Sequence, residues 1–259
     1  MSNSIRILGQ PIDNVSLDGA LKRVEDCLAA NRFAYGVTPN VDHIMKLRHD
    51  ADFRAVYAGA SLRVADGVPL VWASRCLGTP LRGRVNGTDL FERLSARAAA
   101  RGWSIFLLGG AGDSAACAAA TLTDRHPALR IAGVYAPAHG FEHDAKECWR
   151  IQAMVRRSGA DILFVGVGAP KQERWIARHG AGCGVRFAIG IGVSFSFVAG
   201  SIPRAPRWMR VHGLEWLWRL SQEPRRLWRR YLIDDLPFLW LVALERLQGP
   251  QGQREEIHG

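Results

Sequence analysis

The sequence predicts an α/β fold in which a mostly parallel sheet is covered by helices and followed by a helical C-terminal appendage. Two observations predict the sheet: short apolar runs alternate with longer helical segments, and Gly- or Pro-containing loops follow most of the runs. A third observation predicts the appendage, because the composition changes after Gly200. We therefore expect an α/β core at residues 1–200 and an appendage at residues 201–259.

The core elements follow from hydrophobic periodicity. Helical spacing, with apolar residues recurring every three or four positions, predicts helices over Leu17–Ala30, Leu90–Ala100 and Ala115–Arg125, and Ser16 is a suitable N-cap for the first. Short runs rich in β-branched and apolar residues predict strands at Ile5–Leu8, Phe33–Val37, Leu62–Val64, Ser104–Leu108, Ile131–Tyr135, Asp161–Val167 and Phe187–Gly192.

The appendage is basic, rich in tryptophan and without a strand signal. Residues 201–259 hold five of the nine Trp residues. We expect helices over Pro206–Leu220, from Pro224 onward and over Asp235–Gln248, because Pro224 and Pro237 each suit the first turn of a helix.

The chain carries 34 Lys and Arg against 24 Asp and Glu, a formal net charge of +10. Much of the excess lies in residues 201–230, which contain eight Arg and two acids. Such a field favours nucleic acid, phospholipid headgroups or phosphorylated substrates. Leu227 and Trp228 share an apolar helical face with Tyr231 and Leu232, beside the arginines, and this pattern favours the headgroup zone of an anionic membrane.

Other classes have little support in the sequence. The five cysteines include no C-x-x-C pair, so we expect buried thiols in a reducing compartment. We expect no signal peptide, because the first residues show no charged-then-apolar pattern, and the apolar run at 236–244 is far shorter than the roughly 20 residues that span a bilayer. We expect no metal ion and no cofactor, a peripheral protein at the cytoplasmic face of the inner membrane, and we leave open whether it forms a homo-oligomer.

Polar motifs follow four of the predicted strands, where parallel sheets bind ligands. They are Thr38-Pro39-Asn40, Asp66-Gly67, Gly109-Gly110 and Gly168–Glu173. Each motif alone has a structural alternative: a helix cap for the first and a turn for the second. Gly109-Gly110 before a helix could cradle a phosphate, although it matches neither common glycine-rich phosphate-binding pattern.

Longer motifs cover nearly the whole chain in order. They are Thr38-Pro39-Asn40, ADGVPLVWASRCLGTPLRGRVNGTDL (65–90), FLLGG (106–110), ILFVGVGAPKQERWI (162–176), IGVSFSFVAG (191–200) and RAPRWMRVHGLEWLWRLSQEPRRLWRRYL (204–232). On these motifs the chain resembles the WecG/TagA/CpsF family, glycosyltransferase family 26.

The resemblance implies a Rossmann-like core of the GT-E type and an inverting transfer from a UDP-sugar donor to a polyprenyl-diphosphate-linked saccharide, for surface polysaccharides and without a clear metal requirement. It implies Asp66 as the general base, with Thr38 beside it, and Gln172 as a substrate contact. It further implies that Arg219, Arg226 and Arg229 reach the diphosphates, and that Asn40, Asn86, Gly87 and Asp89 bind the donor.

The donor sugar stays open among glucose, N-acetylmannosamine and its uronic acid. Relatives often carry Asp where this chain has Ser196, so no acid role passes to that position. Composition and Ser196 lead us to favour glucose, as in the xanthan-type branch, without a physical argument.

Two other classes remain as alternatives: a basic nucleic-acid-binding protein and a dinucleotide-dependent α/β enzyme. No recognised nucleic-acid motif is present, so we expect no nucleic-acid partner. The dinucleotide fingerprint and its acidic ribose ligand are missing too.

Overall fold

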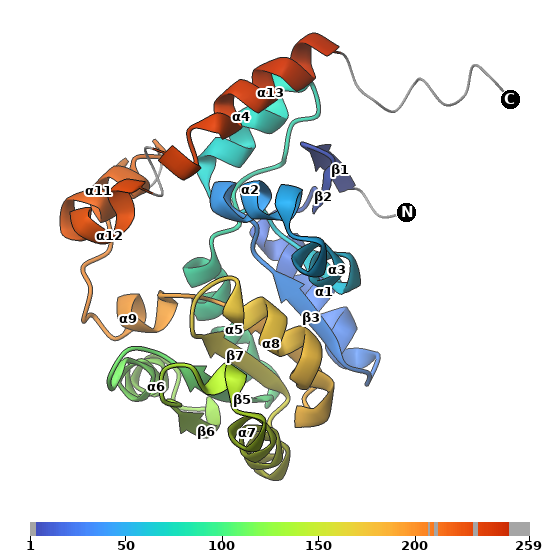
Figure 1. Cartoon of the computed structure of the whole chain (residues 1–259). Helices are drawn as coiled ribbons and strands as arrows, with labels where there is room; N and C mark the ends of the chain where they lie inside the picture. Colours follow the sequence, from blue (N-terminus) through green and yellow to red (C-terminus); the bar gives the residue numbers. More distant parts are fainter. Residues whose placement is uncertain (1–3, 207, 210–211, 230–232, 249–259) are drawn as a thin grey trace, which may run out of the picture.

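The computed structural model describes residues 4–206, 208–209, 212–229 and 233–248, apart from the side chain of Arg226 (Figure 1). Its centre is a six-stranded sheet with the order β4-β3-β8-β7-β5-β6, and all its pairings are parallel. The strands are β3 (Ala34–Val37), β4 (Leu62–Arg63), β5 (Ser104–Gly109), β6 (Arg130–Tyr135), β7 (Ile162–Gly166) and β8 (Phe187–Gly190). Parallel strands place all their carboxyl ends, and the loops that follow, along one edge.

Helices bury both faces of the sheet, as the unbroken apolar runs of its central strands require. In β5, Ile105 and Leu107 pack in one cluster while Phe106 and Leu108 pack in another. The first cluster includes α1 (Leu17–Ala29), α5 (Gly87–Arg101), α6 (Ser114–Arg125) and α9 (Ser194–Val198). The second includes α7 (Ala145–Ser158), α8 (Lys171–His179), η1 (Phe141–His143) and η2 (Gly180–Cys183).

A third apolar cluster lies beyond the β4 edge. It combines α2 (Val41–His49), α3 (Ala51–Gly59), α4 (Val68–Cys76) and a hairpin of β1 (Ser4–Ile7) and β2 (Gln10–Asp13). Residues Leu8 and Gly9 join the hairpin strands with φ values of 48° and 77°, as a tight two-residue turn requires. The strand expected at Ile5–Leu8 therefore belongs to this hairpin, and its partner β2 was not predicted.

The C-terminal residues are helical, as expected. They form α11 (Glu215–Gln222), α12 (Pro224–Arg229) and α13 (Pro237–Gln248), so both expected proline starts are confirmed. The continuous helix expected over Pro206–Leu220 is wrong, because a turn at His212 and Gly213 precedes α11, which begins at Glu215. In Figure 1, α13 lies alongside α4, and its Phe238 and Val242 are buried in the third cluster.

The predicted α/β fold class is confirmed, and Ser16 caps α1 by accepting from the backbone N–H of Gly19. The expectation of buried thiols is wrong for Cys76 and Cys117, which are exposed. No helix among the described residues is long and apolar enough to span a membrane.

Candidate active site

The loops that follow β3 and β4 meet at the carboxyl edge of the sheet. The backbone N–H of Asp66 donates to the carbonyl of Pro39 over 2.7 Å, and that of Val85 donates to the carbonyl of Ala65 over 2.9 Å. These bonds bring the loop after β3, the loop after β4 and the segment leading into α5 together. Gly67 directly precedes α4 with a φ of 123°, a conformation that favours glycine.

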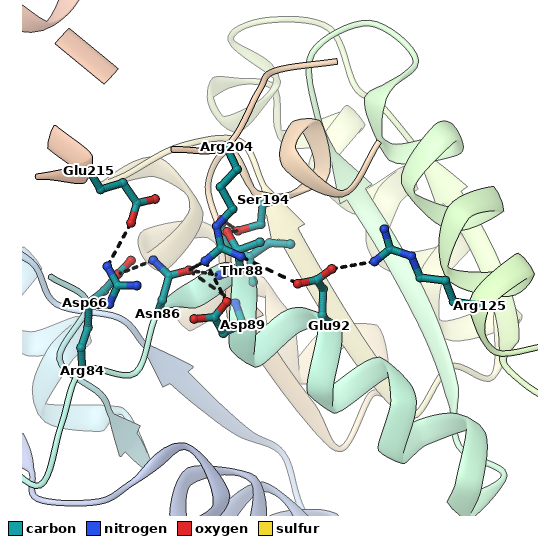
Figure 2. Close-up of polar contacts among 11 residues, drawn as sticks. Asp66, Arg84, Asn86, Thr88, Asp89, Glu92, Arg125, Ser194, Arg204 and Glu215 are labelled. Atoms are coloured by element: carbon teal, nitrogen blue, oxygen red, sulfur yellow. Dashed lines mark hydrogen bonds and ion pairs between the residues drawn. The ribbon is translucent and has the colours of Figure 1, made fainter. Parts of the chain in front are cut away.

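The Asp66 side chain lies at the N-terminus of α5. Asn86 caps this helix by accepting from the backbone N–H groups of Thr88 and Asp89, while its amide nitrogen donates to Asp66 Oδ1 over 3.0 Å (Figure 2). The backbone N–H of Gly87 also donates to the Asp66 carboxylate. A helix N-terminus presents free N–H groups and partial positive charge, so it holds a carboxylate in place.

Burial raises the pKa of Asp66 to about 6. The Arg84 guanidinium, the Gly87 hydrogen bond and Arg219 lower the pKa of Asp66 and so oppose this shift. The Glu215 carboxylate raises it further. A carboxyl group with a pKa near 6 is largely ionised at pH 7 and accepts a proton more readily than an ordinary aspartate. Asp66 therefore has the chemical properties of a general base.

Gln172 ties together the loops that follow β7 and β8. Its Oε1 accepts from the backbone N–H groups of Gly168 (3.2 Å) and Gly192 (3.1 Å), and its Nε2 donates to Glu173 Oε1 over 2.8 Å. Gln172 is only 3% exposed, so in this structure its amide groups hold the rim together. Burial raises the pKa of Glu173 to about 7.

The ends of β5 and β7 approach closely at Gly109-Gly110. The N–H of Gly110 donates to the carbonyl of Gly166 over 2.9 Å. A Cβ atom on Gly109 would lie 2.5 Å from Val167, so the close approach itself requires glycine there.

The remaining core candidates occupy the same edge. Thr38 is buried at the end of β3, and Asn40 caps α2 by accepting from the backbone N–H of His43 over 3.1 Å. Asp89 accepts from Arg204 over 2.7 Å, and Arg204 also donates to the Asn86 side chain over 3.2 Å (Figure 2).

The C-terminal helices reach this site through α11. Glu215 of α11 pairs with Arg84 over 2.9 Å, and Arg219 acts electrostatically on Asp66. Arg229 is exposed on α12, and the side chain of Arg226 lies outside the described residues. The sequence motifs contained Arg84, Arg204 and Glu215, but no local signal distinguished them from neighbouring charged residues.

A groove of about 840 Å³ lies close to Asn40 in the chain, since Asp42 is one of its lining residues. Residues of α2, α3, the start of α8 and the 233–237 segment line it, and Asp66 is not among them. Within the described residues no cluster of three His, Cys, Asp or Glu side chains could hold a metal ion.

A raised carboxyl pKa at the rim of a parallel sheet, with guanidinium groups beside it, is typical of an α/β enzyme with a general base. The family model described as "Glycosyl transferase WecG/TagA/CpsF family" matches residues 5–252. The chain belongs to this family of glycosyltransferases.

Three curated relatives share one name, N-acetylglucosaminyldiphosphoundecaprenol N-acetyl-beta-D-mannosaminyltransferase. The chain is 31% identical to that of Bacillus spizizenii, over 79% of this chain and 77% of the relative. It is 31% identical to that of Bacillus subtilis (71% and 69%) and 28% identical to that of Staphylococcus aureus strain MW2 (92% of each).

Membership of the family decides against the nucleic-acid-binding and dinucleotide-dependent classes. These relatives are named for N-acetylmannosamine transfer, so they lend no support to a glucose donor or to the xanthan-type branch.

Proposed function

We propose that this protein transfers N-acetylmannosamine from its UDP derivative to N-acetylglucosamine linked through diphosphate to a polyprenol, with inversion at the anomeric carbon. The named activity of the relatives supports this sugar and this acceptor. The observation that carries the mechanism is Asp66, a carboxyl group with a pKa of about 6 held at the N-terminus of α5.

In the proposed reaction, the acceptor hydroxyl oxygen attacks the anomeric carbon while its proton passes to the Asp66 carboxylate. The bond from that carbon to the diphosphate oxygen breaks, and UDP leaves with the electron pair. Proton removal by a positioned base contributes about 10²–10⁴-fold to such a rate.

Guanidinium groups stabilise the charge that gathers on the diphosphate. Arg219 is the best-placed candidate, because it already acts on Asp66, and we assign Arg226 and Arg229 to the lipid diphosphate. For Asn86 and Gly87 the proposed role is indirect, because both donate hydrogen bonds to Asp66. Asn40, Asp89 and Gln172 would then shape the donor site from the surrounding loops.

The proposed acceptor is a membrane lipid, and the C-terminal helices suit an anionic membrane surface. Trp216 and Trp228 are exposed on α11 and α12, the helices that carry the arginines, and Trp240 is exposed on α13. We expect the protein to sediment with vesicles of phosphatidylglycerol and phosphatidylcholine, less so at high salt, and the Trp216→Ala/Trp228→Ala variant to bind several-fold more weakly. Equal binding by the variant would contradict attachment through these helices.

A donor panel tests the function directly. UDP-N-acetylmannosamine, its uronic acid, UDP-N-acetylglucosamine and UDP-glucose are each incubated with a short polyprenyl-diphosphate N-acetylglucosamine, and the product linkage is assigned by NMR. We expect a β-linked N-acetylmannosaminyl product. Transfer of glucose alone would replace the donor assignment, and no transfer from any donor would refute the proposal.

A further inference from the structure

Glu215 is an acid in the most basic part of the chain. Residues 201–230 contain eight Arg and only two acids, Glu215 and Glu223. An acid in the first turn of a helix is favoured by the helix dipole, and this alone would explain Glu215 at the start of α11. However, its carboxylate does not face solvent: its Oε2 lies 2.9 Å from Nη1 of Arg84, 131 residues earlier in the chain.

The Glu215–Arg84 pair is largely shielded from water. The side chains are 16% and 17% exposed, respectively. An ion pair in such a position interacts more strongly than an exposed pair, and removing one partner leaves the other charge poorly solvated. The pair therefore joins α11 to the core at a defined point.

That point lies beside Asp66. Arg84 precedes Asn86 by two residues, and Asn86 donates to Asp66 Oδ1. Figure 2 shows the Glu215–Arg84 contact next to the Asp66–Asn86 contact. The Glu215 carboxylate is thus brought near the candidate base rather than to a remote part of the surface.

Helical spacing links this contact to Arg219. Residues four apart lie on the same face of a helix, so anchoring Glu215 at Arg84 directs Arg219 to the same side. The charged groups acting on Asp66 are Arg84 from the loop before α5 and Glu215 and Arg219 from α11. The neutral N–H of Gly87 in α5 also acts on it through a hydrogen bond.

We propose that Glu215 is a positioning residue for sugar transfer: its pair with Arg84 seats the first turn of α11 beside Asp66 and thereby aims Arg219 at the reacting groups. This inference rests on the proposed function. It assigns to an acid of the basic appendage a task that none of the arginines can perform, because only an anion can pair with Arg84.

The Glu215→Gln variant removes the charge and keeps the shape of the side chain. We expect kcat to fall about tenfold to a hundredfold, as small misplacements of reacting groups do, with the KM for the UDP-sugar within about twofold. The matched control is Asp26→Asn, which removes one negative charge from an exposed pair with Lys22 on α1. The control variant should keep the wild-type kcat.

The acid limb of the pH–rate profile separates positioning from mere support of the fold. The Glu215 charge raises the pKa of Asp66, and its effect is larger than the opposing effect of Arg219. Losing the Glu215 charge therefore lowers the pKa of Asp66 as long as Arg84 stays beside it, and the acid limb shifts to lower pH. A lower kcat with an unchanged acid limb would overturn the inference.

Two readouts do not depend on transfer. In Glu215→Gln, amide hydrogen exchange across α11 should rise at least fivefold, and the Asp66 carboxyl carbon, followed by NMR, should titrate at lower pH than in the wild type. If the wild type transfers no sugar, the proposed function fails while these readouts still judge the contact. If hydrogen exchange and the Asp66 titration both keep their wild-type values in the variant, the positioning role of Glu215 is refuted. Should Glu215→Gln not fold, Glu215→Asp, which keeps the charge, is measured in the same way.

Discussion

Glu173→Gln tests whether a buried carboxyl group beneath the rim makes stability depend on pH. Glu173 is 1% exposed, and burial raises its pKa from 4.5 to about 7, against opposing effects from the Gln172 amide, its own backbone N–H and Lys46. The folded protein therefore holds this proton more tightly than the unfolded chain does. Its contribution to stability falls as pH rises from about 4.5 through about 7, and is constant above that range.

The size of the effect follows from the shift. A change of one pKa unit corresponds to about 1.4 kcal/mol, so moving from 4.5 to about 7 corresponds to about 3 kcal/mol of lost stability at pH 8. Gln at this position cannot ionise, while its carbonyl oxygen can still accept from Gln172. Its amide nitrogen would take the place of Oε2, which has no hydrogen-bond partner, and this costs about 1–3 kcal/mol at every pH.

The assay is urea unfolding of the wild type and Glu173→Gln at pH 5 and pH 8. We expect the stability of the variant relative to the wild type to increase by about 2–3 kcal/mol between pH 5 and pH 8. Comparing the difference at two pH values cancels the constant cost of the unpaired amide. If the two proteins lose stability in parallel between these pH values, Glu173 does not carry the raised pKa and the reasoning fails. Asp26→Asn, at an exposed site, is the control and should parallel the wild type.

Two further substitutions test the surroundings of Asp66. Asn86→Ala removes both the α5 cap and a donor to Asp66, so we expect about 1 kcal/mol of lost stability in urea unfolding and an acid limb of kcat/KM shifted to higher pH; an unshifted limb would contradict the contact. Arg219→Ala removes a positive charge that acts on Asp66, so its acid limb should also move to higher pH and transfer should fall about tenfold or more. Arg225→Ala removes the same charge at an exposed position on α12 and should leave the acid limb and the transfer rate near their wild-type values. Equal losses of transfer in the two arginine variants would show that the net charge of the protein, and not the position of Arg219, causes the effect.

Local physical signals predicted much of the fold. The central strands are apolar on both faces, so each can be recognised as an apolar segment without knowing which strand it pairs with. Ser16, Pro224 and Pro237 mark helix starts through interactions within a few residues of the chain. Strand β2 escaped prediction because Pro11 interrupts it and polar residues stand at both of its ends, so it shows no apolar run. Its pairing depends on the turn that joins it to β1.

The candidate site was predictable to the extent that its residues follow strands. Thr38 and Asp66 follow neighbouring strands of one sheet, and the topology brings them together. The partners that adjust Asp66 could not be read from the sequence. The Arg84–Glu215 pair joins positions 131 residues apart, and its shielding from water exists only once α11 packs on the core.

The most direct test of the account is the pH dependence of kcat/KM for sugar transfer in the wild type and in Asp66→Asn. In the wild type kcat/KM should fall about tenfold per pH unit below about pH 6, the pKa of Asp66. The variant should fold with an unchanged circular dichroism spectrum and lose about 10²–10⁴-fold of the rate at pH 7.5. An Asp66→Asn enzyme that keeps near-normal turnover and the same acid limb would remove Asp66 from the role of base.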